Sequence, residues 1–334
     1  MSTPRARIGA FTRRDILQAI GAASAGAACA PGLAAVRPGY RLVNAMPQLF
    51  KLLDGSADTQ QSTLVARFRA EIIAAHAEVY GFFGAYSDRV LGRYLADVAT
   101  RAARQREQSA GFPAAFADTW ASFVAAMPRT GGEATTVHLL PASHEMMGGA
   151  VRALGARDFV ALGSEEMFER VDDRRALSTY LDHELTHLCH NQNNPEMRSV
   201  TETFFLDRAG PKARLYQLMW LEGLAAHASK MLNPDASVRD VLLSDDLPAR
   251  VAARWPQLVE GVRRNFDATD PNIIGAYVFN GDEAQHMPKS AAYYLGMRLA
   301  DELAKHHDVR DLIILRGEAL RSALLHTLQQ LTPF

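Results

Sequence analysis

The sequence predicts an α+β protein that is predominantly α-helical, with a small β-sheet and helical layers on its N- and C-terminal sides. Apolar residues recur at spacings of three and four through most of the chain, which indicates amphipathic helices. Two short segments near the middle are alternating or β-branched instead, which indicates strands. Of the 334 residues, 48% are hydrophobic and 22% are charged, so the chain has the composition of a soluble globular protein with one enlarged domain or two.

The first 35 residues have the order of an export signal and are left out of the fold prediction. No acid precedes Asp15, and the basic residues are followed by the weakly apolar ILQAIGAASAGAACA. TRRDILQ (12–18) resembles a twin-arginine signal. We therefore expect an exported protein, periplasmic or secreted, delivered by the twin-arginine route. An amphipathic surface helix is the alternative for this segment.

The two cysteines, Cys29 and Cys189, do not predict a disulfide. GAAC (26–29) faintly resembles a lipoprotein box, which would place a lipid anchor on Cys29, while cleavage near Ala34 or Ala35 is an equally open alternative. In either case Cys189 stands alone. No later segment has 18 continuous apolar residues, so no transmembrane span is expected after signal removal. The net charge of −1 gives no reason to expect a nucleic-acid partner.

Residues 36–130 are predicted to form an N-terminal helical region without a chemical motif. The apolar spacing predicts a helix over 62–83 and a second over 87–104 with Ser87 as its N-cap. A third helix is predicted over 114–127, directly after Pro113. This region is expected to be a scaffold or one wall of a cleft.

The candidate catalytic residues all lie in the second region, over 131–334, which is expected to be the catalytic region. TTVHLLPA and DFVALG predict two strands, at 135–142 and 158–163. The remaining segments with strong helical periodicity are 164–191, 215–232 and 288–307.

The segment His183-Glu184-Leu185-Thr186-His187 has the H-E-x-x-H pattern of a catalytic zinc site. Residues four apart on a helix lie one turn apart on the same face, so His183 and His187 can bind one cation. Glu184 lies beside the first ligand, where it can take a proton from a water molecule. The alternative to a metal site is an ordinary amphipathic helix with two histidines and a surface glutamate.

A catalytic zinc site needs a third protein ligand, and two candidates are present. His190 follows His187 by only three residues, and the metzincin pattern expects its helix-ending glycine there, so a helix-end role suits His190 better. Glu222, in MWLEGLAAH on the next strongly apolar helix, is the other candidate.

The segment W-L-E-G-L-A around Glu222 resembles the glutamate-bearing helix of gluzincins, the zinc peptidases whose ligands are two histidines and a glutamate. In the aminopeptidase N branch that helix reads W-x-N-E-G-F-A, with one more residue between Trp and Glu. The later Y-x-x-G motif of that branch is similar to Tyr293-Tyr294-Leu295-Gly296. Tyr293 matches the tyrosine that stabilises the transition state, with Tyr294 as the fallback. Thermolysin relatives carry an aspartate where this chain has Ala226, so the residues behind the ligands must differ.

The order of these motifs also resembles a group of uncharacterised bacterial predicted zinc-dependent proteases, over roughly residues 135–300. The resemblance implies a zincin-like metallopeptidase core and one Zn²⁺ per chain, held by His183, His187 and Glu222. It implies Glu184 as the general base and Tyr293 as the oxyanion partner. Residues 135–142 would be the edge strand beside an extended substrate.

The expected partner is a peptide or protein substrate. No G-x-M-x-N motif for a free amino terminus is evident, which favours an endopeptidase. A hydrolase of a non-protein amide, such as a cell-wall peptide, is one alternative. A zinc-containing binding protein without catalysis is another, which the presence of Glu184 disfavours.

Overall fold

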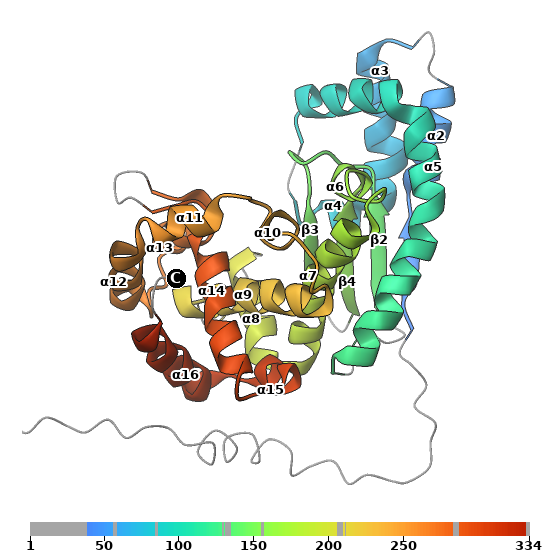
Figure 1. Cartoon of the computed structure of the whole chain (residues 1–334). Coiled ribbons are helices and arrows are strands. Elements are labelled where there is room, and N and C mark those ends of the chain that lie inside the picture. The colour runs from blue at the N-terminus through green and yellow to red at the C-terminus, as the bar shows by residue number, and fades with distance from the viewer. Residues whose placement is uncertain are drawn as a thin grey trace, which may run out of the picture.

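The computed structural model describes residues 39–331, except 56–58, 84–85, 129, 131–134, 155–156, 206–209, 211 and 283–286. The expected export signal and Cys29 lie outside these residues, so both stay predictions. Among the described helices, none combines the length and the apolar character that a membrane crossing requires. The sheet and helix α5 lie on one side of the molecule, and helices α8 to α16 gather on the other (Figure 1).

The N-terminal part begins with β1 (Arg41–Asn44) and α2 (Met46–Asp54), neither of which we predicted. The helix predicted over 62–83 is helical but changes its winding along its length. It consists of α3 (Gln61–Phe68), the π-helical η1 (Arg69–Ile73), the 3₁₀-helical η2 (Ala74–His76) and α4 (Ala77–Tyr80).

Helix α5 (Asp88–Ala126) corrects the prediction of two separate helices over 87–104 and 114–127. It is one helix of 39 residues with Pro113 inside it, and the predicted N-cap Ser87 accepts a hydrogen bond from the Val90 amide. A proline inside a helix removes one backbone hydrogen bond and commonly kinks or ends it. Here Phe112 and Phe116, on either side of the proline, are fully buried. Their packing keeps the helix continuous.

The sheet contains β1, β2 (Thr136–Leu140), β3 (Gly149–Leu154) and β4 (Arg157–Gly163), in the order β1-β2-β4-β3. β1 and β4 run parallel to β2, and β3 runs antiparallel to β4. The strands predicted over 135–142 and 158–163 are confirmed. The expectation that 135–142 is the edge strand is wrong, because β1 pairs with its free side. The edge strand on the β4 side is β3. The division at residue 130 stays a prediction, although β1 joins both regions in one sheet.

The remaining elements are helical, as expected. The first are α6 (Ser164–Phe168), α7 (Arg174–Asn193), α8 (Pro195–Phe205), α9 (Leu215–Leu232), α10 (Val238–Leu242) and α11 (Leu247–Ala252). Next are α12 (Trp255–Asn265), α13 (Pro271–Gly275), the π-helical η3 (Ala276–Asn280), α14 (Ala291–Ala304), α15 (Val309–Ile314) and α16 (Gly317–Gln330). The helix predicted over 215–232 coincides with α9, whereas the one predicted over 164–191 is divided into α6 and α7.

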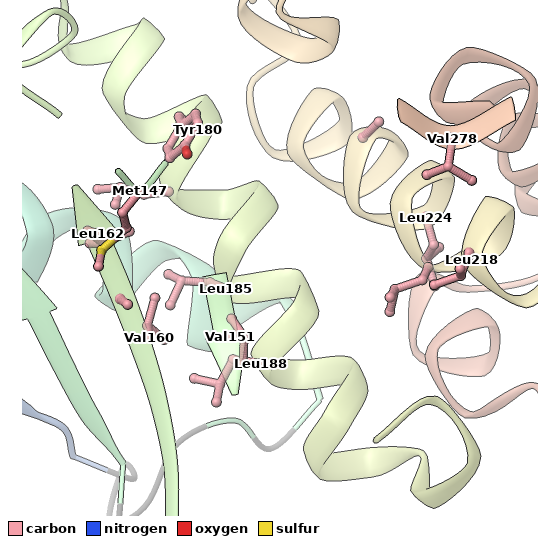
Figure 2. Close-up of a cluster of buried hydrophobic side chains, with 14 of the residues drawn as sticks. Met147, Val151, Val160, Leu162, Tyr180, Leu185, Leu188, Leu218, Leu224 and Val278 are labelled. Atoms are coloured by element: carbon pink, nitrogen blue, oxygen red, sulfur yellow. The ribbon is translucent and has the colours of Figure 1, made fainter. Parts of the chain in front are cut away.

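Helix α7 lies between the sheet and α9. Leu185 and Leu188 on its sheet side pack near Val151 of β3 and Val160 of β4 (Figure 2). Its other side faces α9, which is buried along almost its whole length. The predicted class, a mainly helical α+β protein with a small mixed sheet, is therefore confirmed.

Candidate metal centre

Three side chains from α7 and α9 meet at one point. His183 and His187 lie one turn apart on α7, and Glu222 lies on α9. The two Nε2 atoms are 3.1 Å apart. Glu222 Oε2 is 3.5 Å from His183 Nε2 and 3.4 Å from His187 Nε2. The predicted ligand set is therefore brought together by two helices that are separate in sequence.

These separations fit a tetrahedral metal site. Zinc binds histidine nitrogen and carboxylate oxygen at about 2.0–2.2 Å, so neighbouring ligand atoms of a tetrahedron lie about 3.4 Å apart. The three observed distances lie close to that value. His183, His187 and Glu222 form a group able to hold a metal ion, and their donor set of two imidazoles and one carboxylate suits zinc.

Interactions within the group keep Glu222 in the anionic form that a metal ligand needs, although burial opposes it. Burial opposes the ionisation of Glu222, but the neighbouring His187 and His183 lower the pKa of its carboxyl group below the usual range. Glu222 is only 5% exposed. An anionic carboxylate in such a place requires a cationic partner.

A contact between two glycines positions Glu222. Gly223 of α9 lies against Gly296 of α14, and a Cβ atom on Gly223 would stand 2.1 Å from the carbonyl carbon of Gly296. A Cβ atom on Gly296 would stand 2.1 Å from the Met219 carbonyl oxygen. Only glycine permits backbones to approach this closely. The glycines of E-G and Y-x-x-G are therefore the crossing point of α9 and α14.

This crossing places Tyr293 beside the metal group. Its ring is parallel to that of His183, with centroids 6.3 Å apart and an interplanar angle of 7°. Burial, followed by the charge of its hydrogen-bond partner Glu222, raises the pKa of Tyr293 well above the usual value. The hydroxyl therefore stays protonated and can donate. Tyr294, the fallback, lines a different cavity with Met297 and Arg298.

Glu184 is buried against the edge strand. A Cβ atom on Gly149 of β3 would stand 2.3 Å from Glu184 Oε1 and 2.7 Å from the Tyr180 hydroxyl, so glycine makes the space that this carboxylate occupies. Burial raises the pKa of Glu184 to about 7, with His183 opposing and Glu222 adding to the shift. A carboxyl group with that pKa can both accept and return a proton near neutral pH.

A cavity of about 270 Å³ contains these groups. Its walls come from β3, α7, α8, α9, α10, η3 and α14, and His183, His187, Glu184, Glu222 and Tyr293 all line it. Every residue that the sequence placed in the site therefore borders one cavity.

The other candidates lie elsewhere. His190 is fully buried on α7, outside the metal group, and neither ring nitrogen has a partner among the described residues. Burial raises the pKa of the Cys189 thiol to about 11, and Cys189 is not a member of the group. His227 pairs with Asp301 through Nδ1 at 2.7 Å, and Ser229 donates to the Ala226 carbonyl.

Sequence reasoning missed the β3 wall of the cavity, including Gly149 and Arg152. The segment GGAVRAL is short and begins with two glycines, which have low strand propensity. The alternation of Val151 with Arg152 was the available signal, but it spans too few residues to predict a strand.

The chain matches no protein-family model, no curated protein and no solved structure. The structure therefore defines a mainly helical α+β protein with a three-residue group that could hold a metal ion.

Proposed function

We propose that this chain is a zinc-dependent peptidase with a zincin-like core, of the gluzincin type. The observation that carries the proposal is the convergence of His183, His187 and Glu222 at 3.1–3.5 Å, with Glu184 and Tyr293 in the same cavity. Bound zinc would supply Lewis acidity, which acidifies a water molecule and polarises a carbonyl group.

Two residues beside the metal group have separate roles in the proposed reaction. Glu184 accepts a proton as the water oxygen bonds to the carbonyl carbon of the substrate. It then delivers that proton to the amine nitrogen as the C–N bond breaks. Tyr293 donates a hydrogen bond to the oxygen that becomes negative at the tetrahedral stage. Its raised pKa supports this role because the hydroxyl keeps its proton.

The position of β3 favours an extended peptide as the substrate. β3 is an edge strand, and Gly149, Ala150 and Val151 line the cavity beside Glu184. Edge strands bind extended peptides through main-chain hydrogen bonds, which provide affinity for any sequence. In this proposal the substrate lies along β3 and not along β2.

Metal analysis combined with a base substitution tests the proposal. Purified protein is expected to contain about one zinc per chain and to cleave a peptide library, and a chelator should abolish cleavage. Glu184→Gln should keep the zinc and reduce turnover by a factor of at least about 10². Retained turnover in this variant would remove Glu184 from its role.

The same assay separates the alternatives. Cleavage of muropeptides without cleavage of ordinary peptides would make the chain a cell-wall amide hydrolase. Zinc without hydrolysis of either class would make it a zinc-containing binding protein.

A further inference from the structure

Arg152 is a cation in the wall of the cavity with no role in the proposed chemistry. It lies on β3, and its guanidinium carbon is 4.5 Å from the centre of the Phe205 ring. Stacking on an aromatic face holds a guanidinium in one orientation. Among the described residues that line the cavity, Arg152 is the only lysine or arginine.

The guanidinium is only partly used by the protein. Nη1 donates to the Val151 carbonyl oxygen at 2.8 Å, which holds the group against the edge strand. Nε is buried and has no acceptor. Among the described residues, Arg152 forms no ion pair, and the acceptor that its guanidinium uses is the Val151 carbonyl oxygen. A planar guanidinium with free donors is suited to bidentate binding of a carboxylate.

The charge of Arg152 also lacks a local counterion. The third acid that lines the cavity, Asp240, accepts a hydrogen bond from the Ser237 amide and lies 3.7 Å from Arg175. Glu184 and Glu222 stabilise the Arg152 cation at longer range. A divalent ion held by the metal group would offset the charge of Glu222, which leaves the half-buried Arg152 cation without a close counterion. Buried charges are normally paired.

We infer that Arg152 binds a carboxylate group of the substrate, and so makes the enzyme select peptides with an acidic side chain or a free C-terminus near the cleaved bond. The inference rests on the proposed peptidase function. It assigns Arg152 to substrate recognition, because Arg152 lines the cavity without belonging to the metal group.

The test uses internally quenched octapeptide pools. In one set each position in turn holds Glu or Gln, and in a second set the C-terminus is a free acid or an amide. Zinc-loaded wild-type protein is expected to have a kcat/KM on the order of 10- to 100-fold higher for the carboxylate member of one pair. The pair that shows this preference identifies the source of the carboxylate.

Arg152→Gln should abolish the preference and leave zinc content unchanged, because kcat/KM falls at least about 10-fold more for the carboxylate member of the pair than for its neutral partner. Arg152→Lys keeps the charge but not the planar fork, so it should lower the preference at least about threefold. If the Gln variant does not fold, the Arg152→Lys variant alone tests the inference. Arg106→Gln is the matched control, since Arg106 stacks on Phe50 away from the cavity.

A binding readout separates recognition from catalysis. In the Glu184→Gln background, fluorescence anisotropy with the preferred pool should show a Kd that rises about 10- to 100-fold when Arg152→Gln is added. Cleavage without carboxylate preference, or an equal loss for acidic and neutral pools, would overturn the inference and leave the peptidase intact. Failure of every pool to be cleaved would instead refute the proposed function.

Discussion

The contact between Gly223 and Gly296 is expected to control both the stability and the metal affinity of this protein. Gly223→Ala places a Cβ atom 2.1 Å from the carbonyl carbon of Gly296, 2.3 Å from its Cα and 2.6 Å from the Met297 nitrogen. All three are main-chain atoms of α14, which cannot rotate aside. Carbon atoms in contact lie about 3.5–4.0 Å apart, so the two helices must separate by about 1.4 Å.

The energetic cost follows from that displacement. Overpacking of a buried contact costs about 1–3 kcal/mol, and a clash of backbone against backbone belongs at the upper end. The better helix propensity of alanine returns about 1 kcal/mol. We expect a net loss of about 2 kcal/mol in the free energy of unfolding. Metal distances tolerate about 0.2 Å, so the shift of Glu222 should also lower zinc affinity on the order of 10- to 100-fold.

Urea unfolding of the metal-free protein measures the first effect, and competition with a chromophoric chelator measures the second. Gly111→Ala is the matched control, because Gly111 lies in α5 with open space where the Cβ atom would be. It should raise stability by up to about 1 kcal/mol and leave zinc affinity unchanged. If Gly223→Ala unfolds within about 0.5 kcal/mol of wild type and binds zinc equally well, the glycine contact does not position the site.

Three further substitutions test the site and the sheet. Tyr293→Phe should keep the zinc and lower kcat on the order of 10²- to 10³-fold; an unchanged kcat would exclude the hydroxyl from the reaction. Glu222→Ala should lose the zinc, and a variant that keeps one equivalent would exclude Glu222 as the third ligand. His138 is 4% exposed, and burial lowers its pKa from 6.5 to about 4, with smaller effects from His76 and Arg41. As the pH falls from 6.5 to 4, His138 becomes protonated in the unfolded chain but stays neutral in the folded protein. The free energy of unfolding therefore falls in that window, by up to about 3 kcal/mol. Wild type and His138→Leu should differ in this slope of unfolding free energy against pH, and parallel curves would contradict the argument.

The sequence predicted a feature correctly where all the residues that specify it lie within one helix or strand. The periodicity of 215–232 predicted α9 with its observed bounds. The i,i+4 spacing of His183 and His187 predicted two imidazoles on one face, and their Nε2 atoms are 3.1 Å apart. Pro113 misled because proline is a local signal for a helix end, whereas the buried aromatic residues around it act through tertiary packing.

The sequence by itself determined the helical class, the two central strands and the pairing of His183 with His187 on one helix face. Those properties depend on residue type and spacing along one element. Only the tertiary structure decided that β3 is the edge strand, that Tyr293 and not Tyr294 borders the metal group, and that Arg152 shares its cavity. These depend on how elements distant in sequence pack. The contact between Gly223 of α9 and Gly296 of α14 determines how these two helices pack at the site. The sequence around each glycine does not predict which other glycine it will contact.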